Sequence, residues 1–397
     1  MRRSTALWPP SGGEAEMPRA RDRERVLPRH AYVHVPFCAR RCAYCDFAIA
    51  VRSRVPLDPY LEALAREVSI RFPPGQPWIA DTLYLGGGTP SLLGASGVAR
   101  LMDVLRSRIT LAPGAEITLE ANPDDVTALA VRAWRAAGVN RLSLGSQSFD
   151  DRVLGWMRRT HTAGQVQLAV DAARDAGFDN ISLDLIFGLP SALGREWALD
   201  LERALALRPE HLSLYGLTVE DHTPLQRWRD RGVVVEAPEE GYEREYLAAH
   251  AAAEASGLRH YEVSNYARPG FESRHNSSYW SGVAYAGLGP SAHEFDGLRR
   301  RWNVPAYAEW VRRLSAGRDP LAGAEELSDA NRYTERVYLG LRTSAGLVVE
   351  PNGIGAVRRW VAQGWATLDG RRLRLTPTGW LRLDALATVL TSAPSRC

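Results

Sequence analysis

The sequence predicts an α/β fold in which six βα units form a parallel barrel, complete or partial, with a small winged-helix-like domain at the carboxyl end. Two patterns lead to this expectation. Short apolar runs alternate with longer amphipathic segments from residue 31 to about 217, and two helical segments followed by a hairpin pattern come after residue 323. A chain of 397 residues is also long enough for one barrel-sized core and a smaller appendage.

The expected strands are short apolar runs bounded by Gly, Pro or Asn. They cover Ala31–Val35, Thr82–Gly86, Glu116–Ala121, Arg141–Gly145, Asn180–Gly188 and His211–Leu217. The segments between them are amphipathic and cover Tyr60–Arg71, Gly97–Arg108, Thr127–Ala137, Ala163–Ala176 and Glu196–Leu207. Strands joined by helices pair in parallel, so we expect a barrel at residues 31–217 with its ligands at the carboxyl ends of the strands.

Three further segments are expected around this barrel. Residues 1–30 are rich in Pro, Gly and Arg and are predicted to be a disordered tail, in which Met17 is a second candidate start. Residues 218–323 do not continue the alternation of short apolar runs and amphipathic segments, and they are predicted to form an extension packed on the barrel. In residues 324–390 we expect helices at Ala330–Leu341 and Gly355–Gln363 and a hairpin of Trp365–Leu368 and Leu373–Thr376 about an Asp-Gly turn.

Charge and composition narrow the functional classes. Apolar residues make up 45% and charged residues 24%, which is ordinary for a globular protein. The net charge of +3 lies in residues 1–30, where seven Arg stand against four acids, so residues 31–397 are neutral. A neutral body argues against nucleic-acid binding. No apolar window is long enough for a membrane span, and we expect a cytoplasmic protein.

Three of the four cysteines lie in a CxxxCxxC motif, Cys38, Cys42 and Cys45, directly after the first expected strand. Such clustering in an intracellular protein indicates metal or cluster ligation, and three thiolates can hold three irons of a cubane while the fourth stays open. Structural zinc with His34 as fourth ligand, or three buried thiols, are the alternatives. Cys397 ends a frayed tail and is not expected to be a ligand.

Polar and glycine-rich positions follow several of the later strands. Gly86-Gly-Gly-Thr-Pro90 follows the second strand, and glycines there allow backbone to approach a polar ligand closely. Glu120, Gln147 and Asp184 stand at later strand ends, with Arg159 shortly after the fourth. Carboxylates at one barrel mouth can accept ribose hydroxyls and an Arg can pair with a carboxylate, so we predict a cofactor cradle.

The motifs HVPFCARRCAYCDF, GGGTPS, LEANPDD, LGSQSF, RRTH and SLDLIFGLP, in this order, resemble radical SAM proteins of the coproporphyrinogen III oxidase-like group over about residues 31–390. The resemblance implies a partial (β/α)6 radical SAM barrel in which Cys38, Cys42 and Cys45 hold a [4Fe–4S] cluster. S-adenosylmethionine (SAM) would bind the open iron and be cleaved to a 5′-deoxyadenosyl radical. The residues that would line the SAM site are Tyr32, Tyr44, Gly87, Gly88, Thr89, Glu120, Gln147, Arg159, Asp184 and Gly216.

Two branches of that group can be distinguished at two places in this sequence. The oxidase branch carries a further Cys two residues after the third, whereas Asp46 and Phe47 follow Cys45 here. The run Arg274-His-Asn-Ser-Ser-Tyr-Trp280 resembles the HNxxYW signature of the HemW branch of haem chaperones. The resemblance therefore implies haem as a third cofactor with His275 as its ligand, and the alternative is a core histidine bonded within the fold.

The expected function is that of a haem chaperone, and whether the protein is also an enzyme is left open. Its expected partners are haem, haem-accepting respiratory proteins, some of them membrane-associated, an electron donor for the cluster, and a second copy of the chain in a homodimer. Two other functions stay open: an oxygen-independent coproporphyrinogen III oxidase, and a radical SAM enzyme acting on RNA. The second is suggested only by the winged-helix pattern.

Overall fold

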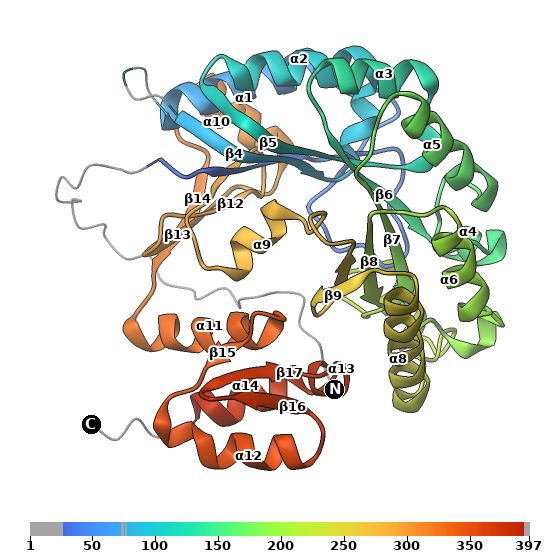
Figure 1. The fold of residues 1–397 in the computed structure, drawn as a ribbon. Helices are drawn as coiled ribbons and strands as arrows, with labels where there is room; N and C mark the ends of the chain where they lie inside the picture. The colour runs from blue at the N-terminus through green and yellow to red at the C-terminus, as the bar shows by residue number, and fades with distance from the viewer. Residues whose placement is uncertain (1–26, 73–74, 76–77, 393–397) are drawn as a thin grey trace.

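The computed structural model describes residues 27–72, 75 and 78–392. Most of the predicted N-terminal tail and Cys397 lie outside these residues. A nine-stranded sheet forms the centre of the molecule, with strand order β11-β1-β4-β5-β6-β7-β8-β10-β9 (Figure 1). The α/β class and the mostly parallel sheet expected from the sequence are therefore confirmed.

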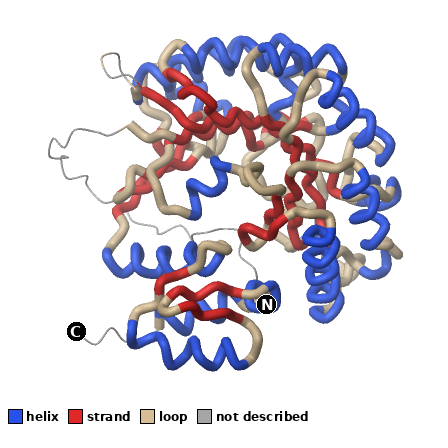
Figure 2. The backbone as a smooth tube through the Cα atoms, in the orientation of Figure 1, coloured by secondary structure: helices blue, strands red, loops and turns tan. Residues whose placement is uncertain are grey.

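All six predicted strands are present and pair in parallel in chain order. They are β1 His30–Val35, β4 Trp78–Gly87, β5 Ile109–Ala121, β6 Arg141–Gln147, β7 Ile181–Phe187 and β8 His211–Gly216. The predicted helices follow them as α1 Leu57–Arg71, α2 Gly94–Arg106, α3 Ala128–Ala136, α5 Ala163–Asp175 and α6 Trp197–Ala206. These helices form an outer layer around the curved sheet (Figure 2). The six-residue helix α4, Asp151–Trp156, was not predicted.

The sheet is larger than the sequence pattern indicated, because the extension supplies both of its edges. Strand β11, Ala286–Leu288, pairs in parallel with β1, while β10, Asn265–Ala267, and β9, Arg259–Glu262, continue the sheet antiparallel beyond β8. Strands of three or four residues are too short to show a periodicity in sequence. The barrel is thus partial, with β11 and β9 as its open edges.

Helix α9, Arg274–Trp280, lies within the curve of this open sheet (Figure 1). The side chain of Glu116 on β5 accepts hydrogen bonds from the backbone nitrogens of Arg274 and His275 at 3.0 and 2.9 Å. Thr82 on β4 bonds the imidazole of His275. The helix is therefore held against the inner face of two neighbouring strands, at the middle of β4 and in the second half of β5.

Other elements of the extension cover the barrel from outside. They are α7 Pro224–Asp230, α8 Glu239–Ala255, β12 His293–Phe295, β13 Arg299–Asn303, α10 Tyr307–Ser315 and β14 Leu321–Glu326, with β12, β13 and β14 forming a separate antiparallel sheet. A two-stranded pair, β2 Phe37–Cys38 and β3 Ala50–Val51, flanks the cysteine loop.

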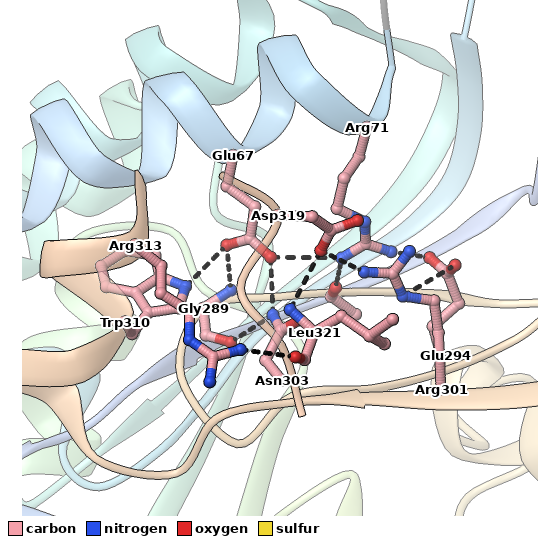
Figure 3. A network of polar contacts seen from close by, with 11 residues as sticks. Glu67, Arg71, Gly289, Glu294, Arg301, Asn303, Trp310, Arg313, Asp319 and Leu321 are labelled. Carbon is pink, nitrogen blue, oxygen red and sulfur yellow. Dashed lines mark hydrogen bonds and ion pairs between the residues drawn. The ribbon is translucent and has the colours of Figure 1, made fainter. Parts of the chain in front are cut away.

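A buried polar network joins α1 to this extension (Figure 3). The carboxylate of Glu67 on α1 accepts from the backbone nitrogen of Gly289 at 2.8 Å, from Asn303 Nδ2 at 2.6 Å and from Trp310 Nε1 at 3.1 Å. Arg71, one turn later, pairs with both Glu67 and Glu294. Because Gly289 directly follows β11, the network anchors that edge strand to the first helix.

The C-terminal residues form the helices and the hairpin that the sequence predicted. Helices α11, Asp329–Arg342, and α12, Ile354–Ala362, precede strands β16, Ala366–Asp369, and β17, Arg372–Leu375. Gly370 in the turn has φ of 57°, which suits glycine. Strand β15, Leu347–Val348, and helices α13, Pro377–Trp380, and α14, Leu383–Thr391, were not expected. The domain boundaries stay predictions.

No helix in the described part of the chain is long and apolar enough to cross a membrane.

Candidate cofactor site

A cavity of about 350 Å³ opens at the carboxyl ends of the parallel strands, where the fold places ligands. Its lining brings together twelve of the fourteen residues predicted from the sequence. They are Cys38, Cys42, Tyr44, Cys45, Gly87, Gly88, Thr89, Glu120, Gln147, Arg159, Asp184 and Gly216. Tyr32 and His275 are not among the lining residues.

The three cysteines sit on a loop that leaves β2 and is held from several sides. The backbone nitrogen of Ala43 donates to Met157 O at 3.0 Å, and that of Leu225 donates to Ala43 O at 2.9 Å. All three thiols are free, with Cys38 buried and the other two half-buried. These two bonds hold the loop between the end of α4 and the start of α7.

The thiols themselves have polar neighbours that suit bound thiolates. Thr89 Oγ1 donates to Cys38 Sγ at 3.4 Å, and Arg159 donates to Cys42 Sγ at 3.5 Å. Burial raises the pKa of the Cys38 thiol and raises that of Cys45 to about 12, so these thiols depend on a metal to become thiolates. In a cubane cluster each thiolate binds a different iron, so the three sulfurs need not surround a single metal ion. The three cysteines therefore fit such a cluster.

His34 offers little to a zinc site. Its Nδ1 pairs with the Tyr32 hydroxyl at 3.1 Å and its Nε2 with Ala48 O at 3.0 Å. Burial lowers its pKa to about 4, so the ring is neutral. Within residues 27–72, 75 and 78–392 no three Cys, His, Asp or Glu side chains gather around a point that one metal ion could occupy.

The glycines after β4 permit the close approach of two segments. A Cβ on Gly87 would come within 2.6 Å of the His34 ring, and one on Gly88 would come within 2.7 Å of Phe37 O. Gly87 also has φ of 114°, a conformation that other residues rarely adopt. The end of β4 can therefore lie directly beside the cysteine loop only because these positions have no side chain.

Two half-buried carboxyl groups face the interior of the cavity. Glu120 accepts from the Tyr84 hydroxyl at 2.9 Å and from Gly87 N at 3.0 Å, and burial raises its pKa to about 7. Asp184 accepts from the Ser143 hydroxyl at 2.9 Å, and burial raises its pKa to about 6. Each group can change its protonation state near neutral pH and can accept hydrogen bonds from a ligand's hydroxyls.

Arg159 joins the loop to the strand ends. It donates to Asn122 Oδ1 at 2.5 Å after β5 and to Gly145 O at 2.8 Å in β6, in addition to Cys42. Nearby Tyr44 and Cys42 raise its pKa further, although burial opposes this, so it stays cationic. A fixed cation beside the cysteines can pair with a bound carboxylate.

His275 lies behind the cavity and is 1% exposed. Its Nδ1 pairs with Thr82 Oγ1 at 2.8 Å and its Nε2 with the Tyr279 hydroxyl at 2.8 Å. Burial lowers its pKa to about 3. Both ring nitrogens are thus occupied, and haem ligation would require one of these bonds to break. Its assignment as a haem ligand stays a prediction.

Comparison with known proteins agrees with this geometry. The profile of the Radical SAM superfamily matches residues 32–204. The heme chaperone HemW of Mycobacterium tuberculosis is 37% identical over 369 residues, which cover 91% of this chain and 95% of that protein. The heme chaperone HemW of Bacillus subtilis is 36% identical over 80% of this chain and 84% of its own length.

The chain belongs to the HemW family. A mouse relative, radical S-adenosyl methionine domain-containing protein 1, mitochondrial, is 32% identical over 90% of this chain and 86% of its own. Among solved structures, coproporphyrinogen III oxidase HemN of Escherichia coli has a TM-score of 0.78 and 23% identity over 94% of this chain and 92% of that one, which shows a shared fold. Membership of the radical SAM superfamily implies a [4Fe–4S] cluster and SAM.

The site of this HemW-family protein includes polar residues that the sequence reasoning missed. Arg141 and Ser143 on β6, His211 and Ser213 on β8, and Asn276 of the HNSSYW motif also line the cavity. The strand residues are spaced by two, so they share the inner face. Polar residues at alternate positions of buried strands are the sequence signal that could have found them.

Proposed function

We propose that this HemW-family protein is a haem chaperone that binds a [4Fe–4S] cluster, SAM and haem and delivers haem to respiratory proteins. The observation that carries this proposal is its 37% identity to a heme chaperone over 91% of the chain. Asp46 and Phe47 agree with it. The oxidase branch carries a further Cys two residues after the third cysteine, whereas Asp46 and Phe47 follow Cys45 in this chain.

Within this proposal Cys38, Cys42 and Cys45 hold the cluster, which supplies one electron to SAM when both are bound. Thr89 and Arg159 donate to the ligating sulfurs and offset part of their negative charge. Such charge-assisted contacts are stronger than neutral ones.

The remaining cavity residues position SAM. Gly87 and Gly88 let the backbone come close to the ligand, and Glu120 and Asp184 accept hydrogen bonds from its hydroxyls. We place Tyr32 behind them, where its ring stacks on Tyr84 with centroids 6.1 Å apart and supports that wall of the cavity.

The partners belong to the same proposal. We propose respiratory haem proteins as recipients, an electron donor for the cluster, a homodimeric state and a cytoplasmic location. Free thiols that ligate a cluster suit a reducing compartment. Coproporphyrinogen III oxidation is the second candidate, and the shared fold with E. coli HemN is the observation behind it.

One experiment separates the two functions. The chain is reconstituted anaerobically with iron and sulfide, and one sample is divided between a haem titration and an assay of coproporphyrinogen III turnover with SAM and a reductant. We expect about four irons per chain, as a single cubane requires, haem binding, and no turnover. Turnover without haem binding would refute the chaperone and favour the oxidase.

A further inference from the structure

The cysteine loop borders a second hollow besides the cofactor cavity. All three cysteines line the cavity on one side of the loop. On its other side lies a groove of about 260 Å³, which reaches to the start of α10. Arg41 and Ala48 of the loop line the groove together with Ala306 and Tyr307. Because Ile49 lines both the cavity and the groove, a single stretch of chain forms the wall between them.

Two arginines on the groove side are bonded directly to residues that would hold the cluster. Arg41, which lines the groove, donates from Nη1 to Cys45 O at 3.3 Å. The backbone nitrogen of Arg52 donates to Cys38 O at 2.9 Å, and the Arg52 side chain is exposed. A partner that contacts either guanidinium is therefore separated from a cluster ligand by one residue and one hydrogen bond.

A packed aromatic pair leads from the groove to the first cysteine. The Tyr307 ring lies edge-on against Phe37 with centroids 5.1 Å apart, and Phe37 is fully buried and directly precedes Cys38. Burial raises the pKa of Tyr307, and the positive charge of Arg52 opposes this rise, so Arg52 lies near the groove as well. Electron transfer weakens steeply with distance and is favoured through packed and bonded atoms. This contact therefore gives a short route from the groove to the cluster site.

The surface around the groove is basic, although the chain from residue 31 onward is neutral. Residues 38–55 contain four Arg and one acid, Asp46. Arg52 and Arg54 are exposed, and neither forms an ion pair with any other residue that the structure describes. Glu309 on α10 is already paired with two arginines of its own helix. The positive charge of this surface is therefore available to a partner.

We propose that the groove and the arginines around it form the docking surface for an acidic one-electron carrier protein, which reduces the cluster through the outer face of the cysteine loop. The inference rests on the proposed function, in which the cluster needs an electron donor. SAM occupies the cavity side of the loop, so a protein donor has to approach from the groove side. The carrier is oxidised by one electron and the cluster is reduced by one, and no proton or group is transferred.

Charge complementarity suits such a partner. Opposite charges speed the encounter of two proteins and orient them, and complexes that transfer electrons are typically small and short-lived. A shallow groove within a basic surface matches these requirements. The exposed side chain of Val51, which directly precedes Arg52, adds an apolar contact beside the charges.

The test measures how fast a purified reduced flavodoxin, an acidic one-electron carrier, reduces the reconstituted full-length protein. Stopped-flow absorbance at low ionic strength follows both the flavin and the cluster, and added salt should slow the reaction. Arg52→Glu/Arg54→Glu should lower the second-order rate constant by about tenfold or more. Arg358→Glu/Arg359→Glu is the matched control, because it reverses two exposed charges on α12, and it should leave the rate constant within about twofold of the parent's.

A second pair of variants tests the groove without removing an arginine. Ala306 is exposed and directly precedes α10. Ala306→Glu adds a negative charge at the groove and should slow reduction by flavodoxin several-fold relative to Ala306→Gln, which has nearly the same size. Dithionite, a small reductant that needs no docking surface, should reduce the parent and every variant to the same extent. Iron content should also be equal in all of them.

The outcomes separate this inference from the proposed function. If Arg52→Glu/Arg54→Glu and Ala306→Glu are reduced by flavodoxin as fast as their controls, the carrier docks elsewhere and only this inference falls. If dithionite reduces the parent but flavodoxin does not, the partner is of another class and the inference is equally wrong. If the parent holds no iron, or dithionite does not reduce it, the proposed function falls too. Should the double arginine variant lose iron, the comparison of Ala306→Glu with Ala306→Gln decides.

Discussion

Replacement of Glu67 tests how the extension is held on the barrel. The Glu67 side chain is fully buried, and its two oxygens receive four donors: Arg71 at 3.2 Å, Asn303 at 2.6 Å, Gly289 N at 2.8 Å and Trp310 Nε1 at 3.1 Å. Glu67→Ala leaves all four without this acceptor. Asn303 keeps its bond to Gly289 O, and Arg71 keeps Glu294 and Gly287 O (Figure 3).

The magnitude follows from those losses. Removing one partner of a buried ion pair costs about 3–5 kcal/mol. Each neutral donor left unsatisfied in the interior costs about 1–3 kcal/mol, and water that enters the space of the lost carboxylate offsets part of this. We therefore expect Glu67→Ala to lower the free energy of unfolding by about 3–5 kcal/mol, a large share of the about 5–15 kcal/mol of a typical domain. Glu67→Gln keeps the size and one acceptor and should cost less.

Urea denaturation, followed by circular dichroism and tryptophan fluorescence, measures this change. Glu62→Ala is the control on the same helix: its carboxylate is 67% exposed and 3.7 Å from Arg66, so its loss should change the free energy of unfolding by less than about 1 kcal/mol. Hydrogen exchange should show the added opening in Glu67→Ala around β11 and β13. Equal stability of Glu67→Ala and Glu62→Ala would refute the reasoning.

Three further predictions concern the site. Cys42→Ser should abolish cluster assembly, whereas Cys397→Ser, outside the described residues, should leave the iron content unchanged; equal loss in both would contradict a three-cysteine site. Because burial raises the pKa of Glu120 to about 7, its carboxylate form grows from about a tenth at pH 6 to about nine-tenths at pH 8. SAM affinity, measured by calorimetry, should rise over this range if the carboxylate accepts the ribose hydroxyls, and Glu120→Gln should remove the dependence; parallel pH profiles of parent and variant would speak against that role. The parent should not convert coproporphyrinogen III to protoporphyrinogen IX with SAM and a reductant, even at rates well below about 1 per second, and sustained product formation seen by chromatography would reinstate the oxidase.

The strands and helices that build the barrel could be predicted from the sequence because each is long enough to show its period. Strands β1 and β4 to β8 and helices α1, α2, α3, α5 and α6 were all expected near their observed positions. The edge strands β9, β10 and β11 were missed, since three or four residues carry no period and their pairing is decided by contacts distant in the chain. The number of strands in the sheet thus depends on tertiary contacts and not on the local sequence pattern.

The position of the cavity could also be predicted, because it depends on the arrangement of the predicted parallel strands. Parallel strands place their carboxyl ends at one mouth, so Cys38, Glu120 and Asp184 come together although they are far apart in the chain. Side chains that reach the cavity from other directions could not be predicted in this way. Arg141 and His211 stand at the starts of their strands, and Asn276 comes from α9 inside the open sheet.

The HNSSYW motif shows where sequence reasoning stops. A motif identifies residues that act together, and here each has a definite task in the fold. His275 bridges Thr82 and Tyr279, Asn276 lines the cavity, and the Trp280 ring lies 4.2 Å from the guanidinium of Arg342 on α11. The helix therefore joins the inner face of the barrel to the C-terminal helices, and both ring nitrogens of its histidine are used in doing so. A ligand to haem must have a free nitrogen, and that property of a side chain depends on its neighbours in space, which a motif does not record.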